Sequence, residues 1–440
     1  MTDTIAAIAT ATGRAGIGVV RVSGPDARYL GEQITGGSLQ PRVARHCAFL
    51  DADGEPVDHG IALYFAAPAS FTGEDVLELQ GHGGAVVMQL VLSAVLDRGA
   101  RLAQPGEFTE RSFVNGKMDL AQAEAVADLI AGRSEAAVRG ALRSLRGEFS
   151  EFVNSIDEEV LALRVYVEAA IDFPDEEVEL LSDGAAADRV AGIRVALDEL
   201  LESSRRGVVL AEGITVALLG APNVGKSSVL NALAAQPRAI VTELPGTTRD
   251  LIHAPLEIGG LAVTLVDTAG LRDTDDAVEQ EGVRRAVDQA RQADVVLLVR
   301  DLSAASSEDV DEKVLGDAPR LVVENKVDLT ELEAGPGGRG RVRVSALTGA
   351  GIDALRQSLL EQVGYAQETT TFTARERHLR ALGQARKSLD RATTLVEEQA
   401  AAELVAEELR SVHAFLGEVV GETTSDALLG EIFSSFCIGK

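Results

Sequence analysis

At 440 residues the chain is long enough for roughly two to four domains, each with a buried core. Its net charge of −28 at pH 7 argues against a protein that coats nucleic acid unaided, because neutralising phosphates requires clustered Lys and Arg. Its two cysteines make no disulfide framework, and it shows neither a leader peptide nor a membrane-spanning apolar run, so we expect a cytoplasmic protein without a membrane segment.

The first part of the chain, residues 1–115, mixes short β-branched runs with Gly and Pro. The runs 17–22, 61–65 and 76–79 predict strands, and the apolar stretch 86–96 predicts a helix. Strands interrupted by a helix in this way are typical of a compact α+β domain.

Helical periodicity begins near Met118 and returns after residue 372. Three apolar sets recur at helical spacing: Val138, Leu142, Leu145 and Phe149; Ile156, Val160, Leu163 and Val167; Leu409, Val412, Leu416 and Val419. Neither block has an obvious second surface to bury its apolar face against, so we expect the two to pack on each other. The prediction is one discontinuous helical domain, formed by residues 116–210 and 367–440.

The intervening residues, 211–366, alternate between strands and helices. Strands are predicted at 214–219, 261–266, 295–299, 321–324 and 342–345. This order predicts an inserted Ras-like, doubly wound α/β domain that binds its ligand at the carboxyl ends of the strands. The glycine-rich run 335–340 is expected to be a loop. The fold class is therefore α/β plus α, in three domains.

Four short motifs follow one another in this inserted domain: Gly220–Ser227, Thr247-Thr248, Asp267–Gly270 and Asn325–Asp328. The first fits the phosphate-loop pattern, whose glycines let backbone N–H groups turn toward phosphates. One such loop can arise by chance, but four motifs in this order indicate a GTP-binding domain.

The residues of these motifs have distinct chemical roles. Lys226 supplies a positive charge to the β- and γ-phosphates, and Ser227 offers a hydroxyl to Mg²⁺. Asp267 can reach the same metal through a water molecule. Asn325 and Asp328 select the base, because a carboxylate can accept two hydrogens from a guanine edge, which adenine does not offer.

The residue after the third motif is Leu271, where small signalling GTPases have a glutamine that orients the attacking water. Three alternatives remain open from the residues themselves. A carboxylate of 272–281 can position the water, Arg249 or Arg272 can act as an arginine finger, or a monovalent cation can bind at Asn223 and the loop before Thr248.

Five segments resemble those of the MnmE (TrmE) family of tRNA-modification GTPases: Ser70–Gly84, Pro105–Arg111, Asn115–Val126, Tyr166–Glu177 and Gly430–Lys440. The resemblance covers nearly the whole chain. The terminal Phe-Cys-Ile-Gly-Lys is its most specific part, because no packing rule predicts such a tail.

The resemblance implies an N-terminal domain that dimerises and binds a 5-formyl-tetrahydrofolate or a related folate. It also implies a homodimer that forms a heterotetramer with the FAD-dependent flavoprotein MnmG (GidA) and meets tRNA mainly through that partner. Together the two proteins would add an aminomethyl or carboxymethylaminomethyl group to C5 of the wobble uridine of certain tRNAs. In this family K⁺ performs the work of an arginine finger as the GTPase domains close.

The resemblance further implies roles for individual residues. Magnesium would be bound by Ser227 and Thr248, and Glu279 would be the catalytic residue that positions water, with Glu281 close enough to compete for that role. The K⁺ ligands would be Asn223, Thr242, the carbonyl of Leu244, and Thr247. The GTP contacts would be Asn223, Val224, Gly225, Lys226, Ser227, Ser228, Thr242, Thr247, Thr248, Asp267, Thr268, Ala269, Gly270, Asn325, Lys326, Asp328, Ser345, Ala346 and Leu347.

The folate would be bound by Arg21, Glu78, Lys117 and Lys440. An alternative interpretation is an ordinary surface ion pair between Arg21 and Glu78, with Lys117 solvated. Cys437 is a catalytic candidate by the same resemblance, whereas a lone cysteine beside Phe436 is otherwise typical of a small buried hydrophobe.

A different class of function remains an alternative: a GTP-driven switch of the ribosome-assembly or signalling type, with a helical effector domain and no one-carbon chemistry. The motifs do not separate the two, but folate binding does. A GTPase that binds nucleic acid by itself is disfavoured by the charge of −28.

Overall fold

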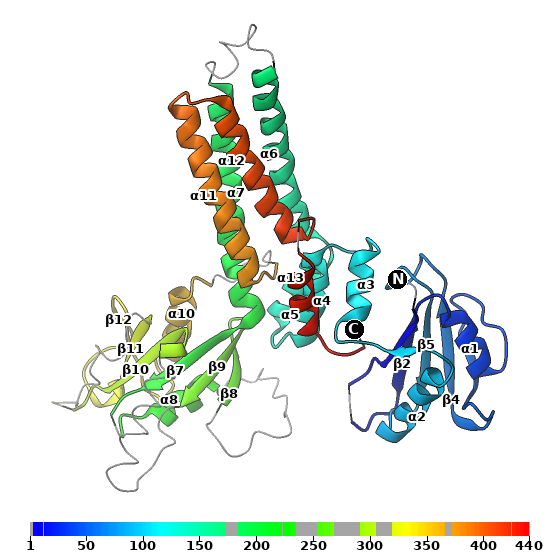
Figure 1. Cartoon of the computed structure of the whole chain (residues 1–440). Helices are drawn as coiled ribbons and strands as arrows, with labels where there is room; N and C mark the ends of the chain where they lie inside the picture. The colour runs from blue at the N-terminus through cyan, green and yellow to red at the C-terminus, as the bar shows by residue number, and fades with distance from the viewer. Residues whose placement is uncertain are drawn as a thin grey trace, which may run out of the picture. The chain divides into compact units, whose positions relative to one another are not determined.

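The computed structural model describes residues 3–11, 13–172, 184–221, 223–234, 253–267, 291–304, 319–365, 372–423 and 425–439. The chain divides into two compact units, of which Figure 1 shows the elements. One unit contains Met1–Ala127, Ser150–Ile193 and Gln384–Lys440, and the other contains Asp128–Phe149 and Arg194–Gly383.

The first unit contains a six-stranded sheet in the order β3-β4-β5-β2-β1-β6. The strands are β1 Ile5–Ile8, β2 Gly18–Ser23, β3 Arg45–Leu50, β4 Pro56–Phe65, β5 Val76–Gly81 and β6 Arg101–Leu102. Helices α1 (Ala27–Thr35) and α2 (Ala85–Leu96) share one apolar core with the sheet. The predicted strands and helix of this region are confirmed to within a few residues, except that β4 begins earlier, and α1, β1, β3 and β6 were not predicted.

The opposite face of this sheet is covered beside β1 by helix α3 (Glu107–Val114). Ile5 and Ala7 of β1 point to this side, where they form a small core with Ala103, Phe108 and the ring of Phe71. Helix α4 (Leu120–Ala131) follows, and its Leu120 and Ala123 pack with Phe433 and Phe436 near the end of the chain. The first and last parts of the sequence therefore share a core.

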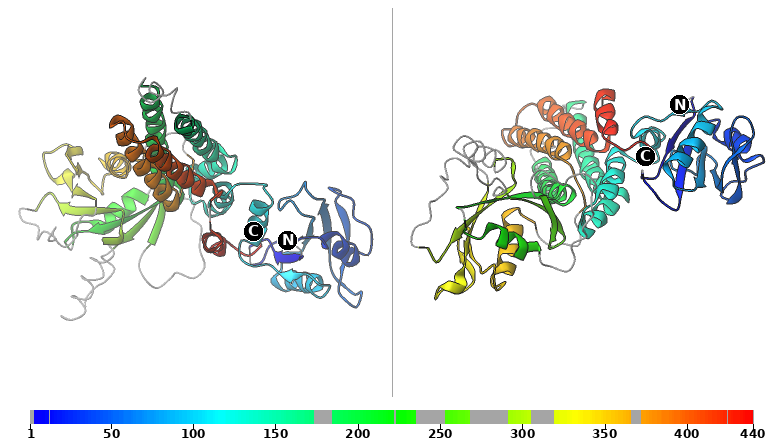
Figure 2. Two further views of the ribbon diagram at one scale, coloured as in Figure 1. Left: turned by 45° about the horizontal axis from the view of Figure 1, so that its top comes forward. Right: turned by 90° about the horizontal axis from the view of Figure 1, so that it is seen from below.

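Long helices supply the rest of the first unit: α6 Glu148–Asp172, α7 Ala185–Glu212, α11 Glu376–Glu397 and α12 Ala402–Val420. The parts of these helices within the unit lie side by side in both figures (Figures 1 and 2). Val160 and Val167 of α6 and Leu409 and Leu416 of α12 are fully buried. Asp157 Oδ1 of α6 lies 2.7 Å from His413 Nδ1 of α12, so the two helical blocks pack on each other, as predicted. A short helix, α13 (Asp426–Ser434), follows.

The second unit contains a seven-stranded sheet in the order β12-β13-β11-β10-β7-β9-β8. Its strands are β7 Ile214–Leu219, β8 His253–Ile258, β9 Leu261–Asp267, β10 Val295–Asp301, β11 Arg320–Asn325, β12 Gly335–Gly338 and β13 Arg341–Arg343. Strand β7 is parallel to both of its neighbours, β9 and β10, so the chain order reverses there. The predicted doubly wound α/β fold is confirmed, with its switch point at the carboxyl end of β7.

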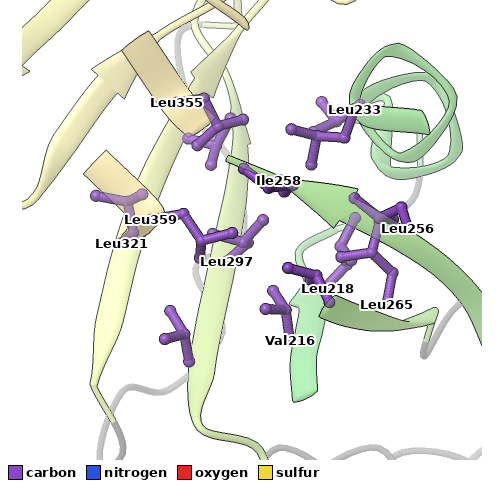
Figure 3. Close-up of a cluster of buried hydrophobic side chains, with 14 of the residues drawn as sticks. Val216, Leu218, Leu233, Leu256, Ile258, Leu265, Leu297, Leu321, Leu355 and Leu359 are labelled. Carbon is purple, nitrogen blue, oxygen red and sulfur yellow. The ribbon is translucent and has the colours of Figure 1, made fainter. Parts of the chain in front are cut away.

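The core of this sheet is made of aliphatic side chains from adjacent strands and from α8 (Lys226–Ala234) and α10 (Ile352–Gln362), as Figure 3 shows. Leu218, Leu297 and Leu265 are at most 1% exposed. One expectation was wrong: the glycine-rich run at 335–340 is not all loop, because Gly335–Gly338 pairs antiparallel with β13 at the sheet edge. Glycine has no strand preference of its own, so only this neighbour reveals the strand.

Helix α5 (Glu135–Leu145) belongs to the second unit and buries Ala137, Gly140, Ala141 and Ser144. The apolar set expected to share its buried face was partly wrong, since Val138 and Leu142 are 38% and 37% exposed. The small residues allow closer packing, so they form the inner face instead. No helix of the described residues is long and apolar enough to cross a membrane.

Candidate nucleotide-binding site

The phosphate loop connects the carboxyl end of β7 to the first turn of α8, which begins at Lys226. The Nζ atom of Lys226 donates to the backbone carbonyls of Gly220 (2.8 Å) and Ala221 (3.0 Å), so its charge is held over the loop. Backbone N–H groups in the first turn of a helix have no partner within the helix, and the helix dipole adds positive potential there. This end of α8 is therefore suited to bind phosphate.

Two residues of the loop have backbone conformations that matter for its shape. Asn223 has a φ of 63°, and Gly225 has a φ of 97°. A Cβ atom at Gly225 would collide with the side-chain amide of Asn325. Glycine is thus required at this position both by conformation and by space.

Asn325 ends strand β11 and is only 2% exposed. Its Nδ2 donates to the carbonyl of Val224 at 2.9 Å, and its Oδ1 accepts from the backbone N–H of Ala346 at 3.1 Å. This one side chain therefore joins the phosphate loop to the Ser345–Leu347 segment. The sequence predicted Asn325 as a base contact but not this structural role.

Lys326 follows with a φ of 65° and reaches back to the same loop. Its Nζ donates to the carbonyl of Asn223 at 3.1 Å and to Asp301 Oδ2 at 2.5 Å. The hydrogen bond from Lys326 is the largest of the effects that lower the pKa of Asp301 below its ordinary value of 3.8, and Ser303 contributes further. Asp301, at the end of β10, was missed as a site residue, and its only signal was its position at the carboxyl end of a central strand.

A pocket of about 550 Å³ lies where these motifs meet. This volume is in the range of small-ligand sites. Leu329 and Leu347 at its edge are 65% and 87% exposed, so both offer apolar surface to a planar base. The lining residues are Gly225, Ser228, Asn231, Ala232, Asn325, Lys326, Asp328, Leu329, Ala346 and Leu347.

Asp267 ends β9, and its Cα pairs in register with that of Leu218, just before the phosphate loop. The second and third motifs otherwise lie outside the described residues. The predicted site residues in that part of the chain are Thr242, Leu244, Thr247, Thr248, Thr268, Ala269, Gly270 and Glu279. Arg249, Leu271, Arg272 and Glu281, named in the open alternatives, also lie there.

Arg21 and Glu78, predicted to contact folate, are cross-strand partners on β2 and β5. Arg21 Nη2 lies 2.9 Å from Glu78 Oε1, and both side chains are largely buried, at 23% and 18% exposure. The guanidinium also lies over the ring of Phe71, 5.6 Å from its centroid. Arg21 is therefore an aromatic-flanked cation rather than a solvated surface group.

Lys117 contacts the segment that carries Phe71. Its Nζ donates to the carbonyl of Pro68 at 3.1 Å, and its side chain lies beside Gly73. Segment 68–73 thus connects Lys117 with Arg21. The fourth predicted folate contact, Lys440, lies outside the described residues.

The last described residues pack on the N-terminal sheet. Ile438 forms a β-bridge with Pro105, and Gly439, with a φ of 93°, approaches the carbonyl of Ile8. The Cys437 side chain is exposed, which excludes the interpretation of a buried hydrophobe.

Two protein-family models match the chain. The MnmE helical domain matches residues 120–437, and the GTP-binding protein TrmE N-terminus matches residues 4–117. The tRNA modification GTPase MnmE of Azoarcus sp. (strain BH72) is 52% identical over 446 residues, covering 100% of this chain and 98% of that protein. The chain belongs to the MnmE family. The MnmE of Pseudomonas aeruginosa (strain UCBPP-PA14) is 48% identical over 451 residues, covering 100% of this chain and 99% of its own.

Among solved structures, one of an Era variant from Aquifex aeolicus bound to GDP and AlF4− is 26% identical, with a TM-score of 0.28. It covers 40% of this chain and 66% of its own length.

One feature of this MnmE-family chain was not predicted from its sequence: a buried ion network beneath segment 70–75. Arg111 is fully buried and binds Asp3 Oδ1 at 2.8 Å, Glu107 Oε1 at 3.0 Å and Glu74 Oε2 at 3.1 Å. Glu74 Oε2 also accepts from the Ser23 hydroxyl at 2.8 Å. The network fixes the segment that carries Phe71 onto β2 and α3. The i, i+4 spacing of Glu107 and Arg111 was its only sequence signal.

Proposed function

We propose that this MnmE-family chain is a K⁺-dependent GTPase that acts with the FAD-dependent flavoprotein MnmG (GidA). Together they add an aminomethyl or carboxymethylaminomethyl group to C5 of the wobble uridine of certain tRNAs. The observation that carries the GTPase part is the pocket in which Asn325 joins the phosphate loop to the Ser345–Leu347 segment. The tRNA part is supported by relatives of about half-identical sequence that are named tRNA modification GTPases.

The pocket supports a preference for guanine. Asp328 lies in the short 3-10 helix Val327–Leu329 and lines the pocket, where its carboxylate can accept two hydrogens of guanine. Ala346 and Leu347 lie on the same wall and offer a surface for the base. Lys226, held over the loop carbonyls, lies where the β- and γ-phosphates bind in phosphate loops.

The side-chain oxygen atoms at the phosphate loop are suitable ligands for hard cations. Ser227 and Asn223 are exposed at the loop rim, so a hydroxyl and an amide oxygen are available for Mg²⁺ and K⁺ respectively. Among the described residues there is no group of three or more His, Cys, Asp and Glu that could hold a metal ion. Mg²⁺ at nucleotide sites is usually held by one or two protein ligands together with substrate phosphates. Bound cations here would neutralise charge on the transferring phosphoryl group.

The remaining assignments are part of the same proposal. Thr248 completes the Mg²⁺ ligands; Thr242, Leu244 and Thr247 complete those of K⁺; Glu279 positions the attacking water; and Cys437 takes part in tRNA chemistry. Residues 1–115 form a homodimer and bind a 5-formyl-tetrahydrofolate or related folate through Arg21, Glu78, Lys117 and Lys440. Residues 116–210 and 367–440 form the helical domain, and 211–366 form the GTPase domain. The protein works in the cytoplasm, and tRNA binds mainly through MnmG in a heterotetramer.

The test of the GTPase mechanism is hydrolysis by the full chain in K⁺ and in Na⁺ at equal ionic strength. We expect a rate that is fast only in K⁺ and is lost in both Glu279→Ala and Asn223→Ala. Glu281→Ala is the control for Glu279, and Asn154→Ala, at an exposed position of α6, is the control for Asn223. Equal slow rates in both salts would remove K⁺ from the mechanism and return Arg249 and Arg272 to contention.

The one-carbon part has its own test. Calorimetric titration with 5-formyl-tetrahydrofolate should show binding that Arg21→Gln weakens at least about tenfold, because a charged hydrogen-bond donor is lost. Intact GTP hydrolysis with no folate binding would favour the alternative of a GTP-driven switch.

A further inference from the structure

Helix α5, which Figure 1 labels, carries arginines on its solvent face. Arg139 has 75% of its side chain exposed, and Arg146 directly after the helix is also exposed. Arg143 is partly exposed, and Arg133 precedes the helix on the surface. The opposite face, with Ala137, Gly140, Ala141 and Ser144, is buried. We call Arg133, Arg139, Arg143 and Arg146 the α5 arginine face.

The charge of this segment contrasts with that of the chain. Residues 133–146 contain four arginines and one acid, Glu135, which is 4 − 1 = +3, whereas the whole chain carries −28. This local positive charge creates a positive electrostatic potential that can attract a polyanion.

Little in the described part of the chain neutralises these arginines. Arg139 pairs with Glu135 at 2.6 Å, but both side chains are exposed, and such a helix pair is worth only about 0.3–0.5 kcal/mol. Within the described part of the chain, no carboxylate pairs with Arg133, Arg143 or Arg146. Other exposed arginines do have acidic partners, as seen for Arg28, Arg205 and Arg410.

We propose that the α5 arginine face binds the sugar–phosphate backbone of tRNA, an inference that rests on the proposed function. Arg139, Arg143 and Arg146 extend over about 10 Å along the helix axis. That length corresponds to about three phosphates at a backbone rise of about 3.4 Å. Guanidinium groups bind phosphate through paired N–H donors.

The exposed apolar residues of the helix suit the same ligand. Val138 and Leu142 are exposed beside the arginines. Their apolar side chains offer a contact surface for ribose. An acidic peptide would match the charge equally well. RNA is favoured because the relatives that span the whole chain are named for tRNA modification.

The inner face of α5 connects this surface with the GTPase sheet. Ala137 belongs to the core of that sheet, and Ala136 lies beside Gly260 in the turn between β8 and β9. Strand β9 ends at Asp267 of the third GTP motif. RNA bound to the arginine face would therefore lie on a helix that packs directly against a strand of the nucleotide site.

The experiment measures binding of a fluorescein-labelled tRNA transcript to the full chain by anisotropy, at several KCl concentrations. The test variant is Arg139→Ala/Arg143→Ala/Arg146→Ala. The matched control, Arg28→Ala/Arg205→Ala/Arg410→Ala, removes the same charge from exposed arginines that have acidic partners. A third variant with lysine at positions 139, 143 and 146 retains the charge.

We expect the test variant to bind more weakly and with a log–log salt slope smaller by about 2.7. The ratio of the wild-type to the variant affinity for tRNA should then fall about 40-fold between about 50 mM and about 200 mM KCl. The control variant should keep the wild-type slope, and the lysine variant should recover most of it. Thermal unfolding of each variant is measured beside binding, because Arg28 stacks on Tyr64 and Arg143 is only partly exposed.

Several results would overturn the inference. Equal slopes for the test and control variants would place RNA elsewhere on the chain, and no RNA binding by the wild type at low salt, either alone or together with MnmG, would exclude the site altogether. Displacement of the tRNA by poly-glutamate at equal charge concentration would assign the face to an acidic protein. K⁺-dependent GTP hydrolysis, measured on the same samples, shows separately whether the proposed function itself has failed.

Discussion

Replacing Arg111 should strongly lower the stability of the N-terminal sheet. Arg111→Met keeps most of the side-chain volume but removes the cation from Glu107 and Glu74, whose side chains are 7% and 12% exposed. Removing one partner of a buried ion pair costs about 3–5 kcal/mol, because the remaining charge stays buried without that partner. Here Glu74 loses Arg111, and Glu107 keeps only Arg101. We expect a loss of this size at about pH 7.

The control is Arg101→Met. Arg101 binds two of the same acids, Asp3 and Glu107, at 2.7 and 2.6 Å, but its side chain is 44% exposed. Water can replace an exposed cation, so the expected cost is only about 0–1 kcal/mol. Hydrogen–deuterium exchange of the slowest amides in β1 and β2 measures both losses, and it reports on this sheet without interference from the second unit.

The pH dependence gives the reasoning a second check. Burial by itself would raise the pKa of Glu107, but hydrogen bonds from Arg101, the Gln104 backbone and Arg111 outweigh it and hold the pKa below 4.5. In the wild type Glu107 therefore stabilises the fold above that value, and this stability is lost as pH falls through the lowered pKa.

Arg111→Met removes one of the hydrogen bonds that lower the pKa of Glu107, so this pKa rises. The Glu107 carboxyl then takes up a proton at higher pH, which reduces the cost of burying its charge. The cost of the substitution should accordingly be smaller at about pH 5 than at about pH 7. A cost that is equal at both pH values, or an Arg101→Met variant as unstable as Arg111→Met, would refute this account of the network.

Three further predictions concern the nucleotide pocket. Gly225→Ala should weaken binding of a fluorescent GTP analogue more than about tenfold, because its Cβ collides with Asn325 and its φ of 97° disfavours alanine; Gly383→Ala, where a Cβ meets nothing, should bind normally. Asn325→Ala should lower the melting temperature of the nucleotide-free protein as well as its GTP affinity, since one buried and one partly buried hydrogen bond are lost, and a buried group left unpaired costs about 1–3 kcal/mol; an unchanged melting temperature would limit Asn325 to base contact. Asp301→Asn should weaken GTP binding by loosening Lys326. Because that lysine holds the pKa of Asp301 below 3.8, the wild-type affinity should show no titration of the Asp301 carboxyl above about pH 5, and an Asp301-dependent step there in stopped-flow binding would contradict the assignment.

The sequence predicted those elements of the fold in which local pattern and tertiary demand agree. The central strands β7 and β10 are largely apolar and buried, whereas β9 and β11 alternate buried with partly exposed residues. Each of the four was predicted to within two residues at either end. Strand β8 was missed because it contains a proline, and only its pairing with β9 makes it a strand.

Glycine hid helix α1 and contributed to the wrong choice of the buried face of α5. Helix α1 contains Gly31, which lowers helix propensity, yet a Cβ there would lie 2.7 Å from a methyl of Leu39 and 2.9 Å from one of Leu77. The close packing that requires this glycine involves residues distant in sequence, so no local pattern shows it. The same holds for α5, where the smaller residues rather than the larger apolar ones face the core.

The candidate site divides in the same way. The motifs predicted the residue types that bind phosphate and guanine, because that chemistry is local. The hydrogen bonds of Asn325 to Val224 and of Lys326 to Asn223 join positions about a hundred residues apart. Such pairings depend on strand order, which the motifs do not specify.

The contacts of Ile438 and Gly439 with Pro105 and Ile8 have a consequence for biosynthesis. The strands of the N-terminal sheet are close in sequence and can pair while the chain is still being made. At about 5–20 residues per second, however, the ribosome needs roughly 15–70 s more to reach residue 438 after residue 105. The contacts of the N-terminal domain at Pro105 and Ile8 are therefore completed only after the last residues of the chain have been synthesised.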